Sequence, residues 1–221
     1  MKISILMLTY NAYKYVFNSI WTLRKTNKKI KYELIVVDNA SRWPTKIVLA
    51  FLRLIGSIDK LYYNGYNSLF AKGNNIASGL ADKDSTHYLL LNSDVEIKDP
   101  DWLYKLSSLH TSPGISSLGC VKRNPIRADG YCLLVDKWIY DKYRLDENYE
   151  WWWAVTKLES EVLKEGMQIR AVENHENLLH HFGGASGKGW VDAKGMDTNI
   201  KDVLTWFDGK KNDVTIIDSL P

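Results

Sequence analysis

The chain has 221 residues, of which 45% are hydrophobic and 25% are charged, and its formal net charge is +3. This length and composition predict one compact soluble domain with a sizeable core and argue against a disordered chain. The basic residues are scattered, and their densest group, residues 25–29, is typical of a solvated helix end. We therefore expect no nucleic-acid partner.

The cysteines and the apolar segments bear on the location of the protein. Cys120 and Cys132 are too few for a disulfide framework and lack the spacing of a metal-ligand pair, so we expect buried thiols and a cytoplasmic location. The first apolar run ends at residues 9–11 without a cleavage site, which favours a strand over a signal peptide. No apolar stretch approaches the ~20 residues that span a bilayer, so we expect at most peripheral membrane association.

Strand and helix patterns alternate through residue 110. Buried-strand patterns occupy residues 3–8, 34–37, 61–63 and 88–91. Helical patterns lie between them, with apolar spacing at Val16, Ile20 and Leu23, from Pro44 to residue 55, and over residues 71–81. This alternation predicts an α/β fold with a mostly parallel central sheet flanked by helices.

The second half is less regular. Strands are expected at residues 115–121, 131–135 and 169–172, a helix containing Leu158, Val162 and Leu163 is expected to end at Gly166, and a closing helix over residues 198–207 precedes a short apolar tail at 214–217. No internal repeat is visible. We expect one domain over residues 1–221.

Polar residues follow several of the expected strands. Thr9, Asp38 and Asp94 each stand at the carboxyl end of a strand, where open α/β sheets bind their ligands. The three side chains are therefore expected to converge on one crevice. The absence of a Gly-x-Gly-x-x-Gly segment after the first strand argues against a dinucleotide-binding fold.

The loop at residues 67–75, with Asn67, Lys72, Gly73 and Asn75, has the composition of a diphosphate-binding segment. Gly73 allows close backbone approach, Lys72 supplies a positive charge, and the helix that follows presents its positive end. A polar loop that merely caps a helix is the alternative interpretation.

Four segments together resemble the family 2 glycosyltransferases of the GT-A fold, and in particular their rhamnosyltransferase-like branch. The segments are residues 3–11 (ISILMLTYN), 34–41 (LIVVDNAS), 67–75 (NSLFAKGNN) and 89–95 (LLLNSDV). The resemblance implies a single Rossmann-like domain, with residues 1–110 binding the nucleotide and residues 111–221 the acceptor. It implies transfer of a sugar, with inversion, from a nucleotide-sugar donor, UDP favoured, to a glycan, lipid-linked or other hydroxyl acceptor.

The resemblance also assigns donor-binding residues. Thr9, Tyr10 and Asn11 match the end of the family's first strand, where a side chain contacts the base. Asp38 matches an acid that accepts hydrogen bonds from the base or ribose, although a turn cap is the alternative role. Asn75 matches the Asn of the family's loop motif.

A metal site is expected at residues 92–94. Asn92, Ser93 and Asp94 correspond to the family's Asp-x-Asp element with its first acid replaced, so Asp94 is expected to hold Mn²⁺ or Mg²⁺ and to be a catalytic residue. Residues 178–186 resemble the family's late His-x-Gly-Gly-x-Ser motif. Its spacing favours His181 as a second ligand, with His180 as the other candidate; ordinary loop histidines are the alternative.

The general base departs from the family pattern, because the acidic pair that should supply it falls on Ala154 and Val155. Nearby acids are Glu150, Glu159 and Glu161, each of which is ordinarily a solvated charge. Glu150 is the preferred base because the adjacent Trp rings at residues 151–153 would raise its pKa. Those rings are expected either to stack on an acceptor sugar or to pack in the core.

Two other functions are alternatives to sugar transfer. The vacant acidic pair favours a catalytically degenerate module that binds a nucleotide sugar or glycan. A sugar-nucleotide pyrophosphorylase would need a Gly-rich basic loop after the first strand, which residues 10–12 do not provide.

Overall fold

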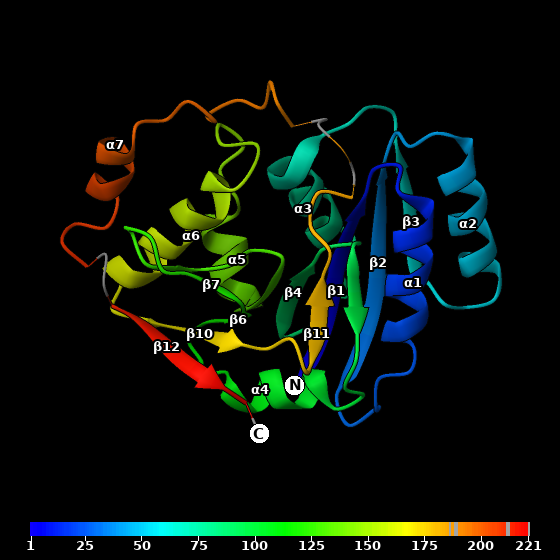
Figure 1. Ribbon diagram of the computed structural model, residues 1–221, viewed down its shortest axis with the longest axis horizontal. Helices are drawn as coiled ribbons and strands as arrows, with labels where there is room; N and C mark the ends of the chain where they lie inside the picture. The colour runs from blue at the N-terminus through cyan, green and yellow to red at the C-terminus, as the bar shows by residue number, and fades with distance from the viewer. Residues whose placement is uncertain (186, 188–189, 211–212, 221) are drawn as a thin grey trace.

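The computed structural model describes residues 1–185, 187, 190–210 and 213–220, and a twisted eight-stranded sheet lies at its centre (Figure 1). Its strands, in spatial order, are β12 (Val214–Ser219), β10 (Gln168–Asn174), β6 (Gly114–Leu118), β9 (Cys132–Asp136), β4 (His87–Leu91), β1 (Lys2–Thr9), β2 (Lys31–Asn39) and β3 (Lys60–Asn64). β9 is antiparallel to both of its neighbours, and the other adjacent pairs are parallel. The parallel strands therefore present their carboxyl ends at one edge.

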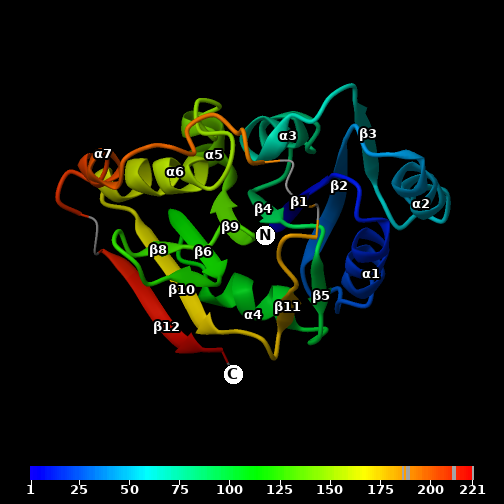
Figure 2. The ribbon, with the colours of Figure 1, turned by 45° about the horizontal axis from the view of Figure 1, so that its top comes forward.

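Helices cover both faces of this sheet (Figure 2). One face carries α1 (Tyr13–Leu23), α2 (Trp43–Leu54) and α4 (Trp102–Leu109), and the other carries α3 (Leu69–Gly79), α5 (Lys137–Tyr143), α6 (Trp153–Lys164) and α7 (Ile200–Thr205). Successive side chains of a strand point to opposite faces, so a doubly covered strand must be apolar at consecutive positions. β1 meets this requirement, with Ile5 and Met7 in one core and Leu6 in the other.

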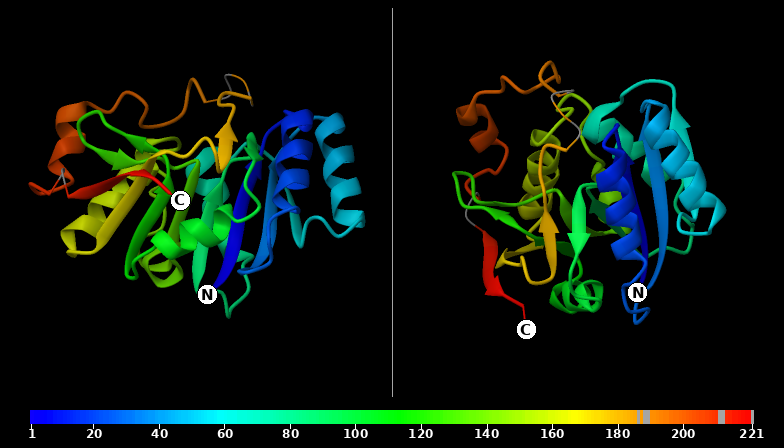
Figure 3. Two further views of the ribbon diagram at one scale, coloured as in Figure 1. Left: turned by 60° about the horizontal axis from the view of Figure 1, so that its bottom comes forward. Right: turned by 45° about the vertical axis from the view of Figure 1, so that its right-hand side comes forward.

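Two short antiparallel pairs lie outside the main sheet. β5 (Val95–Ile97) pairs with β11 (Leu179–His181), and these two strands run side by side in Figure 3. β7 (Cys120–Val121) pairs with β8 (Arg127–Ala128). The first pair matters for function because it brings a late segment of the chain to the end of β4.

The predicted α/β class, the mostly parallel sheet and the flanking helices are confirmed. The strand expected over residues 115–121 is divided into β6 and β7 at Gly119, whose φ of 125° breaks the extended run. The expected apolar tail is β12, a strand that pairs with β10. α4 and α5 were not predicted.

The described helices and cysteines agree in part with the expectations. None of the helices in the described residues is long and apolar enough to cross a membrane. Cys132 is a buried free thiol as expected, whereas Cys120 is also free but only half-buried.

Candidate active site

A cavity of about 480 Å³ opens at the carboxyl ends of β1 and β4. Seven of the residues predicted from the sequence line it: Thr9, Tyr10, Asn67, Asn92, Ser93, Asp94 and His181. The seven remaining predicted residues, described below, have other contacts, and one of these, Asp38, lies directly beside a lining residue. The structure therefore brings together the strand ends that the sequence suggested, but not the whole of the loop between them.

Asp94 and His181 are in direct contact. Nε2 of His181 lies 3.3 Å from Oδ1 of Asp94 and 3.3 Å from the side-chain nitrogen of Asn92. Burial alone would raise the pKa of Asp94, but hydrogen bonding and charge from His181, together with the backbone N–H of Ala185, outweigh it and lower the pKa. Asp94 is therefore a buried anion with an imidazole nitrogen beside it.

The ring of His181 is fixed from behind. It stacks on Tyr131, with ring centroids 4.2 Å apart and planes 13° apart. Asp94 is held from the other side, because its carbonyl accepts a hydrogen bond from the N–H of Phe182 at 3.0 Å. Both candidate metal ligands are therefore oriented before anything binds, which is how outer contacts usually position a metal's ligands.

His180 is placed differently from its neighbour. Residues that follow one another in a strand point to opposite sides, and the ring of His180 packs on Phe182 at 4.7 Å instead of lining the cavity. The choice between the two histidines made from motif spacing agrees with the geometry, and the inclusion of His180 as a possible ligand does not.

Thr9 and Asp38 lie side by side at the ends of β1 and β2, paired in register. Oδ2 of Asp38 accepts a hydrogen bond from the N–H of Ser41 at 3.2 Å, but its Oδ1 has no partner, and neither does Oγ1 of Thr9. Both side chains are 1% exposed or less, and burial raises the pKa of Asp38. Unpartnered buried polar atoms are costly, so this pair is suited to bind a polar ligand.

Asn11 and Lys72 lie outside the cavity lining. The side chain of Asn11 accepts a hydrogen bond from the N–H of Arg42 at 2.9 Å and its own N–H donates to Ser41, so it joins the ends of β1 and β2. Lys72 is exposed, with its ammonium 5.3 Å from the ring centre of Tyr66. Neither contact shows whether these two residues bind the donor.

Gly73 and Asn75 have structural contacts that the loop interpretation did not foresee. A Cβ on Gly73 would lie 2.8 Å from a methyl carbon of Leu8, so the glycine allows α3 to pack closely on β1. The side-chain amide of Asn75 donates to the carbonyl of Leu145 and accepts from the hydroxyl of Tyr140. Asn75 therefore anchors the segment after α5, and the expectation that it packs on the nucleotide is not supported.

The positive end of α3 is also already occupied. The N–H groups of Phe70 and Ala71 donate to the carbonyl of Glu150, and the N–H of Leu69 donates to the side chain of Asn67 at 3.1 Å. A diphosphate could not take these N–H groups without displacing protein contacts. The helix end thus holds the acceptor-side segment in place.

The three acids considered as general bases lie in three different environments. Glu150 accepts a hydrogen bond from the N–H of Lys194 at 2.6 Å and is absent from the cavity lining. Glu161 is a surface residue paired with Lys164 at 2.8 Å, as a solvated charge should be. Glu159 is not solvated: it is 0% exposed, neither carboxyl oxygen has a hydrogen-bond partner, and burial raises its pKa well above the usual range.

Asp129 was missed from the sequence. It lines the cavity directly before Gly130, and a Cβ on Gly130 would lie 2.7 Å from a methyl carbon of Val155. Asp129 therefore stands beside the position at which the family's acidic pair is vacant. The sequence feature that could have indicated it is an acid next to a glycine, in the half of the chain expected to bind the acceptor.

An aromatic wall, formed by Phe70, Trp151, Trp152 and Trp190, closes the opposite side of the cavity. The rings of Trp151 and Trp190 are stacked 6.2 Å apart with their planes at 20°, and Trp152 lies 6.1 Å from Trp190. Trp153 instead packs against the core, with the guanidinium of Arg127 5.4 Å from its ring centre. The expected core packing is thus seen for Trp153, while stacking of the other two rings on an acceptor sugar stays a prediction.

Comparison of the sequence with known families identifies the family of this chain. Residues 4–156 match the family model described as "Glycosyl transferase family 2", which covers more than half of the chain. The chain belongs to glycosyl transferase family 2. No curated protein matches the sequence.

Solved structures with the same fold include enzymes of this type. S. aureus TarS 1–349 in complex with UDP is 18% identical, with a TM-score of 0.56 over 72% of this chain and 55% of that one. The mannosyltransferase PcManGT from Pyrobaculum calidifontis, in complex with GDP-Man and Mn²⁺, is 14% identical, with a TM-score of 0.64 over 80% of this chain and 55% of that one. This family 2 chain therefore spans about half the length of these two proteins.

Proposed function

We propose that this family 2 member transfers a sugar, with inversion, from a nucleoside-diphosphate donor to a hydroxyl acceptor in a metal-dependent reaction. The observation that carries the proposal is the contact between Asp94 and His181 in a cavity that also includes the ends of β1 and β4. A carboxylate and an imidazole fixed side by side fit a divalent cation, whose remaining ligands a diphosphate can supply.

The donor would bind to residues 1–110. Thr9 and Asp38 offer unpartnered oxygen atoms to the base or ribose, and Tyr10, Asn67, Asn92 and Ser93 line the same side of the cavity. The complexes of TarS with UDP and of PcManGT with GDP-Man support a nucleotide sugar as donor. UDP is our preferred nucleotide, and the rhamnosyltransferase-like branch stays a prediction.

Asp94 and His181 would hold Mn²⁺ or Mg²⁺, and the ion would neutralise the charge that develops on the departing diphosphate. Asp94 supplies the anionic oxygen and is already ionised because its pKa is lowered. His181 supplies a nitrogen whose ring is fixed on Tyr131. Lys72 is exposed near the start of α3 and would add positive charge on the donor side.

The acceptor would bind to residues 111–221, against the aromatic wall. Stacked tryptophan rings present flat apolar faces that suit the C–H faces of a sugar, so a glycan or a glycolipid head group fits this wall better than a small alcohol. Its attacking hydroxyl must lose a proton during the reaction. Among the cavity residues that the structure describes, the carboxylates are those of Asp94 and Asp129.

Asp129 is the base that the geometry favours. Asp94 is engaged by His181, whereas Asp129 lines the cavity and its Oδ1 accepts a long hydrogen bond, at 3.4 Å, from the N–H of Tyr131. Glu150, the base expected from the sequence, would have to release the N–H of Lys194 to reach the cavity. It remains the second candidate.

Incubation with a panel of UDP-, dTDP- and GDP-sugars in Mn²⁺ tests the proposal. A donor that binds only the folded protein should stabilise it by about 2.7 kcal/mol at a hundredfold excess over its dissociation constant. Slow hydrolysis of the same donor would distinguish an enzyme from a degenerate binding module, the alternative that the vacant acidic pair favours. No shift with any donor, with or without metal, would refute the donor site. A cytoplasmic location, peripheral membrane contact at most and no nucleic-acid partner remain predictions.

A further inference from the structure

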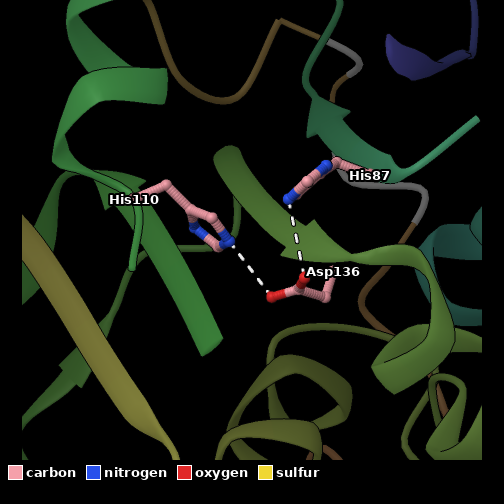
Figure 4. A group of neighbouring side chains, drawn as sticks. All are labelled: His87, His110 and Asp136. Carbon is pink, nitrogen blue, oxygen red and sulfur yellow. Dashed lines mark hydrogen bonds and ion pairs between the residues drawn. The ribbon is translucent and has the colours of Figure 1, made fainter. Parts of the chain in front are cut away.

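A second group of metal-ligand side chains lies far from the cavity. His87, His110 and Asp136 point toward one another in Figure 4, and their ligand atoms all lie within 4.8 Å of each other. Nε2 of His110 is 3.1 Å from one carboxylate oxygen of Asp136, and Nε2 of His87 is 3.5 Å from the other. The side chains of the three residues are 1–10% exposed.

This cluster is separate from the Asp94–His181 pair. His87 is the first residue of β4, whereas Asn92 follows the last one, and five residues of strand span roughly 17 Å. His87 lies directly opposite Asp136 in the pairing of β4 with β9, and His110 follows α4 on the same face of the sheet. The cluster is therefore at the edge opposite the carboxyl ends of the parallel strands.

The two ring nitrogens of His87 differ in their contacts with the described residues. Nδ1 lies 2.8 Å from the hydroxyl of Thr86, whereas Nε2 is buried and has no hydrogen-bond partner. A buried polar nitrogen without a partner is costly, and this one faces the carboxylate of Asp136 at 3.5 Å. A cation bound between the two groups would satisfy both.

The distance from each histidine to the carboxylate suits a small tetrahedral ion. Bonds of 2.0–2.1 Å to nitrogen and oxygen place neighbouring ligand atoms of a tetrahedral Zn²⁺ roughly 3.3 Å apart. The two histidine–carboxylate separations, 3.1 Å and 3.5 Å to the two oxygens of Asp136, lie on either side of this value. An octahedral ion would need three further ligands in a place where the side chains are almost fully buried, whereas a tetrahedral ion needs one.

The surroundings also match those of a metal centre. Nδ1 of His110 lies 3.1 Å from the hydroxyl of Ser116, and Asp136 accepts hydrogen bonds from the hydroxyl of Ser112 and the N–H of Gly114. Each ligand is thus oriented by a partner on its far side, as is usual for histidine and carboxylate ligands.

We propose that His87, His110 and Asp136 form a Zn²⁺ site that joins β4, β9 and the segment after α4. Two imidazole nitrogens and one carboxylate oxygen are ligands that zinc prefers, and Mg²⁺ or Ca²⁺ would select oxygen alone. The site is structural: it lies at the edge of the sheet opposite the donor and acceptor positions, and it ties three separate segments into one body.

The test uses an Asp94→Ala/His181→Ala protein, in which the donor-side ligands are absent. We expect it to bind one Zn²⁺ per chain, measured by competition with a chromophoric chelator, and to melt at a higher temperature with Zn²⁺ than with EDTA. Co²⁺ in place of Zn²⁺ should give the strong visible absorption of a tetrahedral complex. Weak octahedral bands, or no bound metal, would overturn the proposal.

Two variants on this background assign the ligands. His87→Gln and Asp136→Asn should each lower Zn²⁺ affinity by more than about 100-fold, because losing only an outer partner of a ligand costs about 10–100-fold. His175→Gln is the matched control, since it removes a histidine that lies outside the cluster. Unchanged affinity in the two ligand variants, or an equal loss in the control, would refute the assignment. If a variant fails to fold, the Co²⁺ spectrum of the background protein still decides the geometry.

Discussion

Nε2 of His181 lies 3.3 Å from Oδ1 of Asp94, although the two residues come from distant parts of the chain. The contact exists because β11 pairs antiparallel with β5, which places His181 opposite Val95, the residue after Asp94. A late strand thereby completes a site that begins at the end of β4. The pair is the part of the molecule on which the proposed metal dependence rests.

Replacing Asp94 by Ala should abolish Mn²⁺-dependent binding of UDP and reduce sugar transfer or donor hydrolysis by about 10²-fold or more, because the anionic ligand is lost. His181→Ala should act in the same direction with a smaller effect, since it removes a ligand but no charge. Titration calorimetry with UDP, with and without Mn²⁺, measures both. His180→Ala is the control and should bind normally. Wild-type activity that survives EDTA would contradict the prediction.

Replacing Asp38 by Asn should remove most of the thermal shift that UDP produces. The buried carboxylate has one oxygen without a partner, and its role as an acceptor for the base or ribose depends on that oxygen. The change conserves volume, so the free protein should remain folded. A full UDP shift in Asp38→Asn would show that Asp38 only caps the turn at Ser41.

Replacing Asp129 by Asn should lower turnover by about 10²–10⁴-fold while leaving the dissociation constant for the donor unchanged, as the loss of a general base predicts. Glu150→Gln is the matched comparison. Single-turnover measurements in saturating donor separate chemistry from binding. If Glu150→Gln loses activity and Asp129→Asn does not, the sequence-based choice of Glu150 is right and the geometric one is wrong.

A second substitution tests the same assignment in reverse. Val155 occupies the place of the family's acid and lies next to Gly130. Adding Val155→Asp to the Asp129→Asn protein should restore part of the lost turnover by placing a carboxylate beside the same space. Val155→Asn is the control, and an equal effect of the two would mean that the added charge plays no part.

The strands and their polar ends were predictable because they depend on local patterns. A buried run such as Ile3–Leu8 has to be apolar at consecutive positions, and ligand-binding residues collect where parallel strands end. Thr9, Asp38 and Asp94 could therefore be placed together from their positions alone. The parts of the site that depend on loops were less predictable.

The errors arose where one residue type serves two purposes. Asn75 and Gly73 fit a phosphate loop in sequence, yet one anchors Leu145 and the other allows α3 to approach β1. Glu159 looked like an exposed helix charge because the side of α6 that packs on β8 cannot be determined before the strands are arranged. Asp129 was overlooked because the packing of its neighbour Gly130 against Val155 joins distant segments.

The packing role of Gly73 can be separated from helix propensity by comparing it with Gly79 on the same helix. Ala is favoured over Gly within a helix by about 0.8–1.0 kcal/mol, but extra volume in a tight contact costs about 1–3 kcal/mol. Gly73→Ala would press on Leu8 at 2.8 Å, whereas nothing lies within 4 Å of a Cβ on Gly79. Urea unfolding should show that Gly79→Ala stabilises the protein and Gly73→Ala does not. Equal stabilisation by the two substitutions would mean that the side chain of Leu8 moves aside at little energetic cost.

The buried carboxyl of Glu159 predicts a dependence of stability on pH. Burial raises its pKa well above the ordinary value, and the nearby charge of Arg127 only partly opposes this. Above the unfolded pKa of about 4.3, the folded state therefore binds more protons at this residue than the unfolded state does. This residue's contribution to the free energy of unfolding should fall as the pH rises from about 4.3 through the folded pKa.

Replacing Glu159 by Gln keeps the volume and removes the titrating proton. The free energy of unfolding, measured by urea denaturation, should be similar for the variant and the wild type near pH 4 and higher for the variant near pH 8. Glu161→Gln is the control, because that side chain is already paired at the surface, and it should differ from wild type by no more than about 0.5 kcal/mol at either pH. A Glu159→Gln protein that becomes progressively less stable than wild type as the pH rises would show that the carboxylate is ionised and paired with Arg127 inside the protein.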